Sequence, residues 1–259
     1  MKILVLAKHV PDTETVVKIN SNGTAIDSSE FKYIVNPCDD YAIEEAISTQ
    51  EKFSGESVVV SLGASSCQET IRKALAMGID RGVWISTEGL TNELDSYSIA
   101  LALSKVVAEE KPDIIFSGLN TIDEGAGNVG PMVAEFAGIP SILNISKLEW
   151  IKEGKAVTAE REVESGMVEV YESHLPLLIA PAQSLNNPRY ASLPGIMKAK
   201  KKPIVEKKAS EYITDKEKIH ILSYRLPAEK APGKIFKGKP VQEMVTEVVG
   251  LLRTEAKII

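Results

Sequence analysis

The first 185 residues alternate short apolar runs, rich in β-branched residues, with longer amphipathic segments. A parallel sheet requires this order, because each buried strand must be followed by a crossover helix that returns the chain to the same edge. Strands are expected at 2–7, 57–62, 83–86 and 113–118, and helices at 39–52, 66–77, 95–110 and 130–137. The short loops between them predict an α/β fold with a doubly wound, mostly parallel sheet, which binds ligands at the carboxyl ends of its strands.

Two further segments complete the expected architecture. Alternating residues over 156–171 predict a β-hairpin insertion that turns near Ser165 and Gly166, before a buried strand at 175–180. After residue 204, prolines interrupt short apolar stretches until an amphipathic helix at 241–252. We expect an α/β domain over 1–185, an exposed loop and basic run over 186–206, and an extended C-terminal arm over 207–259. An arm of about 50 residues buries little core of its own and should need a partner to become ordered.

Composition limits the possible functions. The chain has 259 residues, of which 44% are hydrophobic, so it can bury a sizeable core. Its first apolar run ends at Lys8 and His9, too short for a signal peptide or a membrane span, and we expect a cytoplasmic protein. Cys38 and Cys67 form no CxxC pattern, and the three histidines are scattered. No metal site and no catalytic residue are predicted.

A glycine-rich loop, GLNTIDEGAGNVGP over 118–131, leaves an expected strand and enters an expected helix. Its four glycines allow backbone amides to approach a ligand closely, and a helix start favours phosphate. The spacing matches neither GxGxxG nor GxxxxGK[ST], so the usual dinucleotide and Walker motifs are absent. A tight structural turn would also use glycine, and the loop alone therefore indicates phosphate binding only weakly.

The segment 185–204, LNNPRYASLPGIMKAKKKPI, combines an extended stretch with a basic run. Pro188 and Pro194 bias the residues before them away from helix, so 189–194 is expected to be a loop that holds Tyr190 and Leu193 outward. Four positive charges follow within five residues of a chain whose formal net charge is −6, at Lys198, Lys200, Lys201 and Lys202. Such a segment is either a solvated loop before a strand or a local interaction surface.

These segments resemble the beta subunit of electron transfer flavoproteins, and the likeness extends through most of the chain. CQETIRKALAMGIDRG over 67–82 and REVESGMVEVYESHLPLLIAP over 161–181 are also similar to the family, although Ser165 departs from its usual acidic residue or glycine. The resemblance implies an adenine-nucleotide alpha-hydrolase-like fold. It also identifies 185–204 with the recognition loop that docks onto dehydrogenases, with Leu193 entering an apolar pocket of the partner. The implied docking residues are Tyr190, Leu193, Pro194, Ile196, Met197, Lys198 and Lys201.

In the resembling family the glycine-rich loop wraps a nucleotide, together with the ends of the first two strands and an NP-containing segment. Here Asp123 and Asn128 would contact ribose or phosphate, while the amides of 125–130 would hold the phosphates. The implied binding residues are Leu6, Asn36, Pro37, Cys38, Asp39, Leu62, Gly118, Thr121, Ile122, Asp123, Glu124, Gly125, Ala126, Gly127, Asn128, Val129 and Gly130.

Family members differ in the nucleotide that they hold. Respiratory members bind AMP as a structural ligand, whereas electron-bifurcating members place a second FAD in the same site. The ending Val129-Gly130-Pro131 and the segment NPCDDYAIEEA resemble bifurcating members, whereas YASLPGIMKAKKK resembles the respiratory recognition loop. The expectation is a second FAD, with AMP as the alternative.

The resemblance implies a subunit that works only with an alpha subunit carrying a mobile FAD. In the bifurcating interpretation, NADH reduces the FAD of this subunit, and electrons pass to an acyl-CoA or related dehydrogenase and to ferredoxin or flavodoxin. In the respiratory interpretation, the nucleotide is inert and the complex shuttles electrons.

Two other classes of protein remain as alternatives. An adenine-nucleotide-binding small-molecule enzyme, such as an ATP-pyrophosphatase relative, would need an early phosphate loop like SGGxDS, where this chain has KHVPDTE. A nucleic-acid-binding protein would need aromatic residues among the lysines, and only Tyr190 is near them.

Overall fold

The computed structural model describes residues 1–259 except 91–93, 216 and 230–231. Its strands are β1 (Lys2–Leu6), β6 (Glu56–Gly63), β7 (Arg81–Ser86), β8 (Ile114–Ser117), β9 (Ser141–Ile151), β10 (Ala156–Glu162), β11 (Val168–His174), β12 (Leu177–Pro181) and β13 (Ile204–Lys208). Among the described residues these form one nine-stranded sheet in the order β11-β10-β9-β12-β8-β1-β6-β7-β13. Neighbours from β9 to β13 in this order are parallel, and β10 pairs antiparallel with both β9 and β11. The predicted fold class is confirmed.

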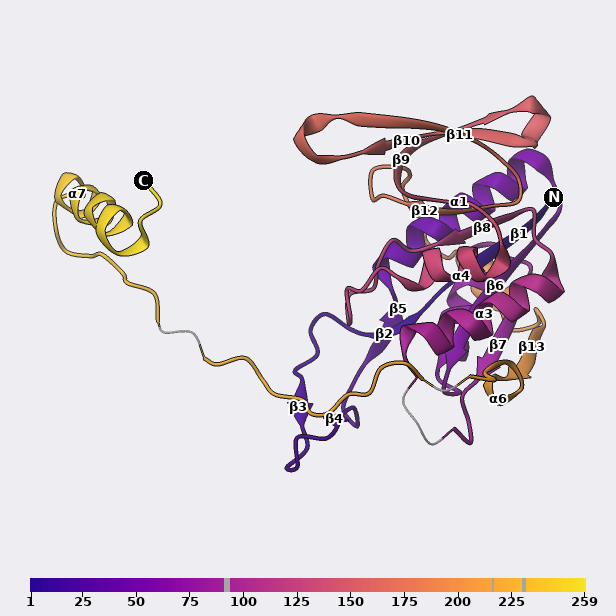
Figure 1. Cartoon of the computed structure of the whole chain (residues 1–259), viewed down its shortest axis with the longest axis horizontal. Coiled ribbons are helices and arrows are strands. Elements are labelled where there is room, and N and C mark those ends of the chain that lie inside the picture. Colours follow the sequence, from indigo (N-terminus) through magenta and orange to yellow (C-terminus); the bar gives the residue numbers. More distant parts are fainter. Residues whose placement is uncertain (91–93, 216, 230–231) are drawn as a thin grey trace.

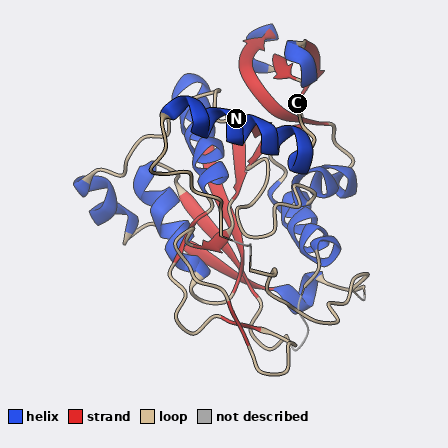
Figure 2. Cartoon of the chain, turned by 90° about the vertical axis from the view of Figure 1, so that its left-hand side faces the viewer, coloured by secondary structure: helices blue, strands red, loops and turns tan. Residues whose placement is uncertain are grey.

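Helices cover both faces of this sheet (Figure 2). The helices are α1 (Pro37–Phe53), α2 (Cys67–Met77), α3 (Ser96–Glu110), α4 (Val129–Ala137), α5 (Leu193–Ala199), α6 (Ala209–Tyr212) and α7 (Val241–Leu251), with short turns η1 (Lys152–Gly154), η2 (Glu164–Gly166) and η3 (Leu252–Ala256). Outside the sheet, β2 (His9–Pro11) pairs with β5 (Tyr33–Val35), and β3 (Lys18–Ile19) pairs with β4 (Ile26–Asp27).

Strand β1 shows why the sheet is covered on both sides. Successive side chains point to opposite faces. Ile3 and Val5 pack in the apolar cluster that contains the buried residues of α1 and α2. Leu4 and Leu6 pack in the cluster that contains those of α3 and α4. A strand buried on both faces has no polar side, which is why its sequence reads as a continuous apolar run.

The predicted strands and helices of the α/β part are present, with ends shifted by one or two residues. Helix α1 begins two residues earlier than expected, because Pro37 is well tolerated in a first helical turn. Strand β9 was not predicted, although it is eleven residues long. In its second half, β9 pairs only with β10 of the antiparallel hairpin, and Lys147 and Glu149 are exposed there. The strand is difficult to predict because its sequence mixes charged and apolar residues.

The predicted hairpin is formed by β10 and β11, which turn through η2. It lies at one edge of the sheet, at the top of the view in Figure 1. Strand β11 is the edge strand, and its outer positions are largely exposed.

The segment expected as a loop over 189–194 ends sooner, because Leu193 and Pro194 already belong to helix α5. Proline suits a first helical turn, and the Ser192 hydroxyl accepts a hydrogen bond from the Gly195 amide at 3.1 Å, which caps the helix. After α5 the chain enters β13, which pairs with β7 at the other edge of the sheet. The expected boundary between residues 206 and 207 therefore falls within a strand.

Beyond α6 the chain leaves the sheet as an extended arm (Figure 1). The arm passes the small β3–β4 ribbon, where the Tyr224 amide donates to the Gly23 carbonyl at 2.7 Å. It ends in α7, which stands apart from the body and contains no buried residue. None of the described helices is both long enough and apolar enough to cross a membrane.

We expect the Glu110 carboxylate to stabilise the amino edge of the sheet in a pH-dependent way. Arg81 binds it at 2.5 Å and Lys2 at 2.7 Å, and the hydrogen bonds from Arg81 lower its pKa to about 2. A lowered pKa stabilises the fold above the unfolded value of about 4.5, and this contribution is lost as the pH falls toward 2. Glu110→Gln should cost about 1–3 kcal/mol at pH 7 in urea unfolding, and about 0.5 kcal/mol or less near pH 2.

The exposed pair between Lys152 and Glu172 provides the control. Glu172→Gln should change the free energy of unfolding by less than about 1 kcal/mol at either pH. An equal loss in the Glu110 and Glu172 variants would contradict the role given to Glu110.

Candidate functional site

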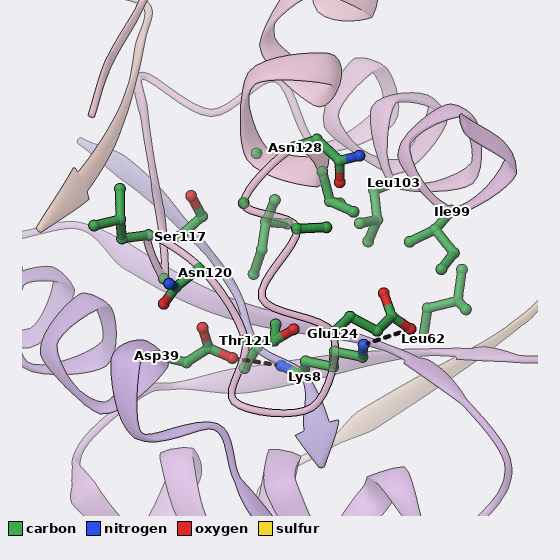
Figure 3. A pocket seen from close by; sticks show the side chains of 18 of the residues that line it. Lys8, Asp39, Leu62, Ile99, Leu103, Ser117, Asn120, Thr121, Glu124 and Asn128 are labelled. Atoms are coloured by element: carbon green, nitrogen blue, oxygen red, sulfur yellow. Dashed lines mark hydrogen bonds and ion pairs between the residues drawn. The ribbon is translucent and has the colours of Figure 1, made fainter. Parts of the chain in front are cut away.

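A cavity of about 110 Å³ lies where the carboxyl ends of β1, β6 and β8 meet the glycine-rich loop (Figure 3). The chain passes from β1 to β6 and β7 on one side, and then crosses to β8 on the other side of β1. The two neighbouring strand ends, β1 and β8, therefore lead their chains to opposite faces of the sheet. This divergence opens the crevice in which doubly wound proteins bind ligands.

A buried amide, Asn36, ties the glycine-rich loop to the start of α1. Its Nδ2 donates to Asp39 Oδ1 and to the Asn120 carbonyl, both at 2.9 Å. Its Oδ1 accepts from the Ile122 amide at 3.3 Å. The Cys38 thiol reaches Asn120 Oδ1 at 3.2 Å. The NP-containing segment over 36–39 thus holds the glycine-rich loop in place through hydrogen bonds. Of its four residues, only Asp39 lines the cavity.

Asp39 is a buried carboxyl at the edge of the cavity. Its Oδ2 accepts from the Lys8 amide at 2.6 Å, and Figure 3 shows this contact. Burial raises the pKa of Asp39 to about 7, against hydrogen bonds from Lys8, Asn36 and Gly118 that favour the ionised form. The carboxyl therefore joins the end of β1 to the end of β8.

The Lys8 ammonium closes the loop over the cavity from the β1 side. Its Nζ lies 2.8 Å from Asp123 Oδ2 and 3.2 Å from Glu124 Oε1. Burial alone would raise the pKa of Asp123, but the hydrogen bonds from Lys8 and Thr121 hold it below its ordinary value. Lys8 lines the cavity and is the cation placed to contact a phosphate there.

Gly118 lets the main chain at the end of β8 pass closer to the start of α1 than any residue with a side chain could. A Cβ at this position would lie 2.0 Å from Asp39 Oδ1 and 3.2 Å from Asn36 Nδ2. The strand end can therefore pass directly over the start of α1 only without a side chain.

The start of α4 supplies free backbone donors at the opposite wall. Asn128 precedes the helix and makes no side-chain capping hydrogen bond, while Val129 and Gly130 line the cavity. The first amides of a helix have no partner within it, and the helix dipole favours an anion at this end.

Two buried polar atoms at the cavity walls fit a bound ligand. Within the described part of the chain, Ser117 Oγ and Asn128 Oδ1 have no hydrogen-bond partner. Leaving a buried polar atom unpaired costs about 1–3 kcal/mol, so such atoms are expected to bind something. The other walls carry Leu6, Leu62 and, from α3, Leu103, which suit the apolar faces of an adenine ring. The residues present therefore fit a nucleotide.

The structure brings most of the predicted binding residues to one cavity. Those that line it are Leu6, Asp39, Leu62, Gly118, Thr121, Glu124, Ala126, Gly127, Asn128, Val129 and Gly130. Those predicted but outside the lining are Asn36, Pro37, Cys38, Ile122, Asp123 and Gly125. Those that line it without having been predicted are Ala7, Lys8, Val60, Ile99, Leu103, Ser117, Leu119 and Asn120.

The predicted docking residues lie on a separate surface, around α5. Tyr190 is 98% exposed and Leu193 is 73% exposed, so both point outward as expected. Ile196 and Met197 are also exposed. Pro194, Lys198, Lys200 and Lys201 are exposed as well. Lys202, in contrast, is half-buried and turned inward, so the basic run presents three lysines rather than four.

Comparison with known proteins agrees with this fold. The electron transfer flavoprotein domain family matches residues 24–212. The chain is thus an electron transfer flavoprotein domain protein. An electron transfer flavoprotein subunit beta of Bacillus subtilis (strain 168) is 43% identical over 263 residues, covering all of both chains. One of Bradyrhizobium diazoefficiens is 38% identical, and a mitochondrial one of Arabidopsis thaliana 35%, each over 261 residues and the full length of both chains. The chain belongs to the family of electron transfer flavoprotein beta subunits.

Gly118→Ala should abolish nucleotide binding. The added Cβ would displace the Asp39 carboxyl, and with it the hydrogen bonds that position the loop. We expect at least a tenfold fall in the nucleotide retained by the purified protein, measured by release on denaturation and chromatography. Gly233→Ala, where a Cβ meets no atom within 4 Å, is the control and should retain the wild-type content. Full retention by Gly118→Ala would exclude the cavity as the binding site.

Proposed function

We propose that this electron-transfer subunit holds the adenylate part of a second FAD in the cavity at the ends of β1, β6 and β8. The observation that carries the proposal is the convergence of unpaired donors and acceptors on one cavity: Ser117, Asn128 and the first amides of α4. FAD and AMP share the adenylate, and the contacts described above suit that shared part. The bifurcating-type segments NPCDDYAIEEA and Val129-Gly130-Pro131 support FAD.

In this proposal the chain works with an alpha subunit that carries the other FAD. Lys8, Ser117, Asn128 and the first amides of α4 would hold the adenylate of this FAD, whose flavin would supply an acceptor for a hydride from NADH. The two electrons of that hydride would be destined one for an acyl-CoA or related dehydrogenase, through the alpha subunit, and one for ferredoxin or flavodoxin. The protein supplies binding, orientation and electrostatics for this chemistry.

AMP is the second candidate because the sequence YASLPGIMKAKKK resembles the respiratory type. In that case the nucleotide stabilises the subunit and the complex only shuttles electrons.

The nucleotide content of the purified complex with the alpha subunit decides between them. FAD and AMP are released by denaturation and counted per heterodimer. We expect two FAD and no AMP. One FAD with one AMP would replace the proposal by the shuttle, and one FAD alone would remove the nucleotide site from this subunit.

Leu193→Ala should weaken docking to the dehydrogenase without changing nucleotide content. An exposed leucine flanked by basic residues has the anatomy of an interface anchor, and truncating such an anchor costs about 2 kcal/mol or more, roughly 30-fold in affinity. Val16→Ala removes an apolar side chain of similar exposure (76%) from the β3 region and is the control. Steady-state electron transfer at varied dehydrogenase concentration measures the effect, and an unchanged KM in Leu193→Ala would place docking elsewhere.

A further inference from the structure

We propose that Lys202 and Arg72 are positioning residues that hold the docking helix α5 in place on α2. The proposal deepens the docking role proposed for α5 and rests on it. Neither side chain reaches the exposed face of α5 at Leu193 and Met197. Both act through main-chain carbonyls, so they fix the backbone rather than any one contact with a partner.

Lys202 connects the end of the basic run to the end of α2. Its Nζ donates to three carbonyl oxygens: Ile79 at 2.5 Å, Leu75 at 3.0 Å and Gly78 at 3.2 Å. These carbonyls belong to the last turn of α2 and the residues after it, where the helix has no further amides to pair with them. A cation is favoured at this end of a helix. Burial lowers the pKa of the Lys202 ammonium, which agrees with its inward position.

Arg72 makes the reciprocal connection. From the middle of α2, its Nη1 donates to the Ala199 carbonyl at 2.6 Å and to the Lys202 carbonyl at 2.7 Å. These two carbonyls end α5 and the turn that follows it. The two helices are thus joined by five hydrogen bonds from two cations to backbone oxygens.

The contact between the two backbones is close enough to need this support. A Cβ on Gly195 would lie 2.4 Å from the Ala76 carbonyl oxygen, so the first turn of α5 rests directly on α2. The approach to α5 is held by ion pairs, since Arg189 binds the carboxylates of Glu44 at 2.9 Å and Glu51 at 2.6 Å on α1. Both ends of the docking segment are therefore attached to the α/β core.

This attachment is needed because α5 is too short to be stable as a helix on its own. A helix of seven residues is far below the length at which isolated helices are stable in water. Leu193 and Met197 are exposed, so their side chains add little packing to its stability in the free protein. A segment already held in its bound conformation avoids the entropy cost of ordering at the interface. Loss of the support should therefore weaken docking although every docking side chain remains.

The test compares Lys202→Met with Lys200→Met in the complex with the alpha subunit. Both remove one positive charge from the same run, but Lys200 is exposed and its side chain makes none of the five hydrogen bonds described above. We expect Lys202→Met to raise the KM for the dehydrogenase about tenfold relative to Lys200→Met, with kcat unchanged. Arg72→Lys, which keeps the charge and loses the reach to two carbonyls, should act in the same direction.

Hydrogen exchange of the amides over 193–199 gives a readout that needs no dehydrogenase. Lys202→Met should speed this exchange about tenfold or more, while Lys200→Met leaves it at the wild-type rate and exchange in β1 stays slow in both. Equal exchange and equal KM in the two variants would overturn the proposal. Failure of the wild-type complex to transfer electrons to any dehydrogenase would instead refute the docking function, and the exchange rates would still decide whether α5 is held by Lys202.

Discussion

One buried amide joins two chain segments that form the candidate site. Asn36 contacts the start of α1 through Asp39 and the glycine-rich loop through Asn120 and Ile122, and all of its side-chain polar atoms are used. Because the site is buried, each of these hydrogen bonds is costly to leave unmade. The loop therefore has one arrangement relative to β1 and α1. The cavity walls follow from that arrangement, including the Lys8 contacts and the exposed start of α4.

The candidate cavity and the proposed docking surface lie toward opposite ends of the parallel strands. The cavity is at the carboxyl ends of the strands, where Leu6, Leu62 and Gly118 meet. Helix α5 packs near the end of α2, which returns the chain to the amino end of β7. A partner that docks at α5, as proposed, would therefore leave the crevice free. Because the two surfaces are separate, a substitution on one of them should not directly affect the other, provided that the protein still folds.

How much could be predicted from sequence depends on how local each interaction is. Strands β1, β6, β7 and β8 can be predicted because burial on both faces leaves a continuous apolar run, whereas the partly exposed β9 cannot. The glycine-rich loop can be predicted because Gly118 and its neighbours stand out in composition. Ser117 and Leu103 were missed, since one is hidden at the end of an apolar strand and the other on the buried face of α3. Lys8 was noted only as the end of an apolar run, because its partners Asp123 and Glu124 are more than a hundred residues away.

In the basic run, too, the position of an individual side chain could not be predicted from the sequence. Four lysines in five positions read as one patch, yet the α5 turn sends Lys202 toward the end of α2 and leaves the other three outward. The sequence alone does not show which lysine is buried and which are exposed. The path of the backbone determines which ammonium group binds carbonyl oxygens and which are solvated. Helix α7 of the C-terminal arm is predictable from its sequence pattern, but the surface that it packs on is not. Val241 and Val245 of α7 are exposed and no residue of this helix is buried, so its apolar positions require a surface that the rest of the described chain does not provide. Beta subunits of this family pair with an alpha subunit, and that subunit is the surface on which we expect α7 to pack.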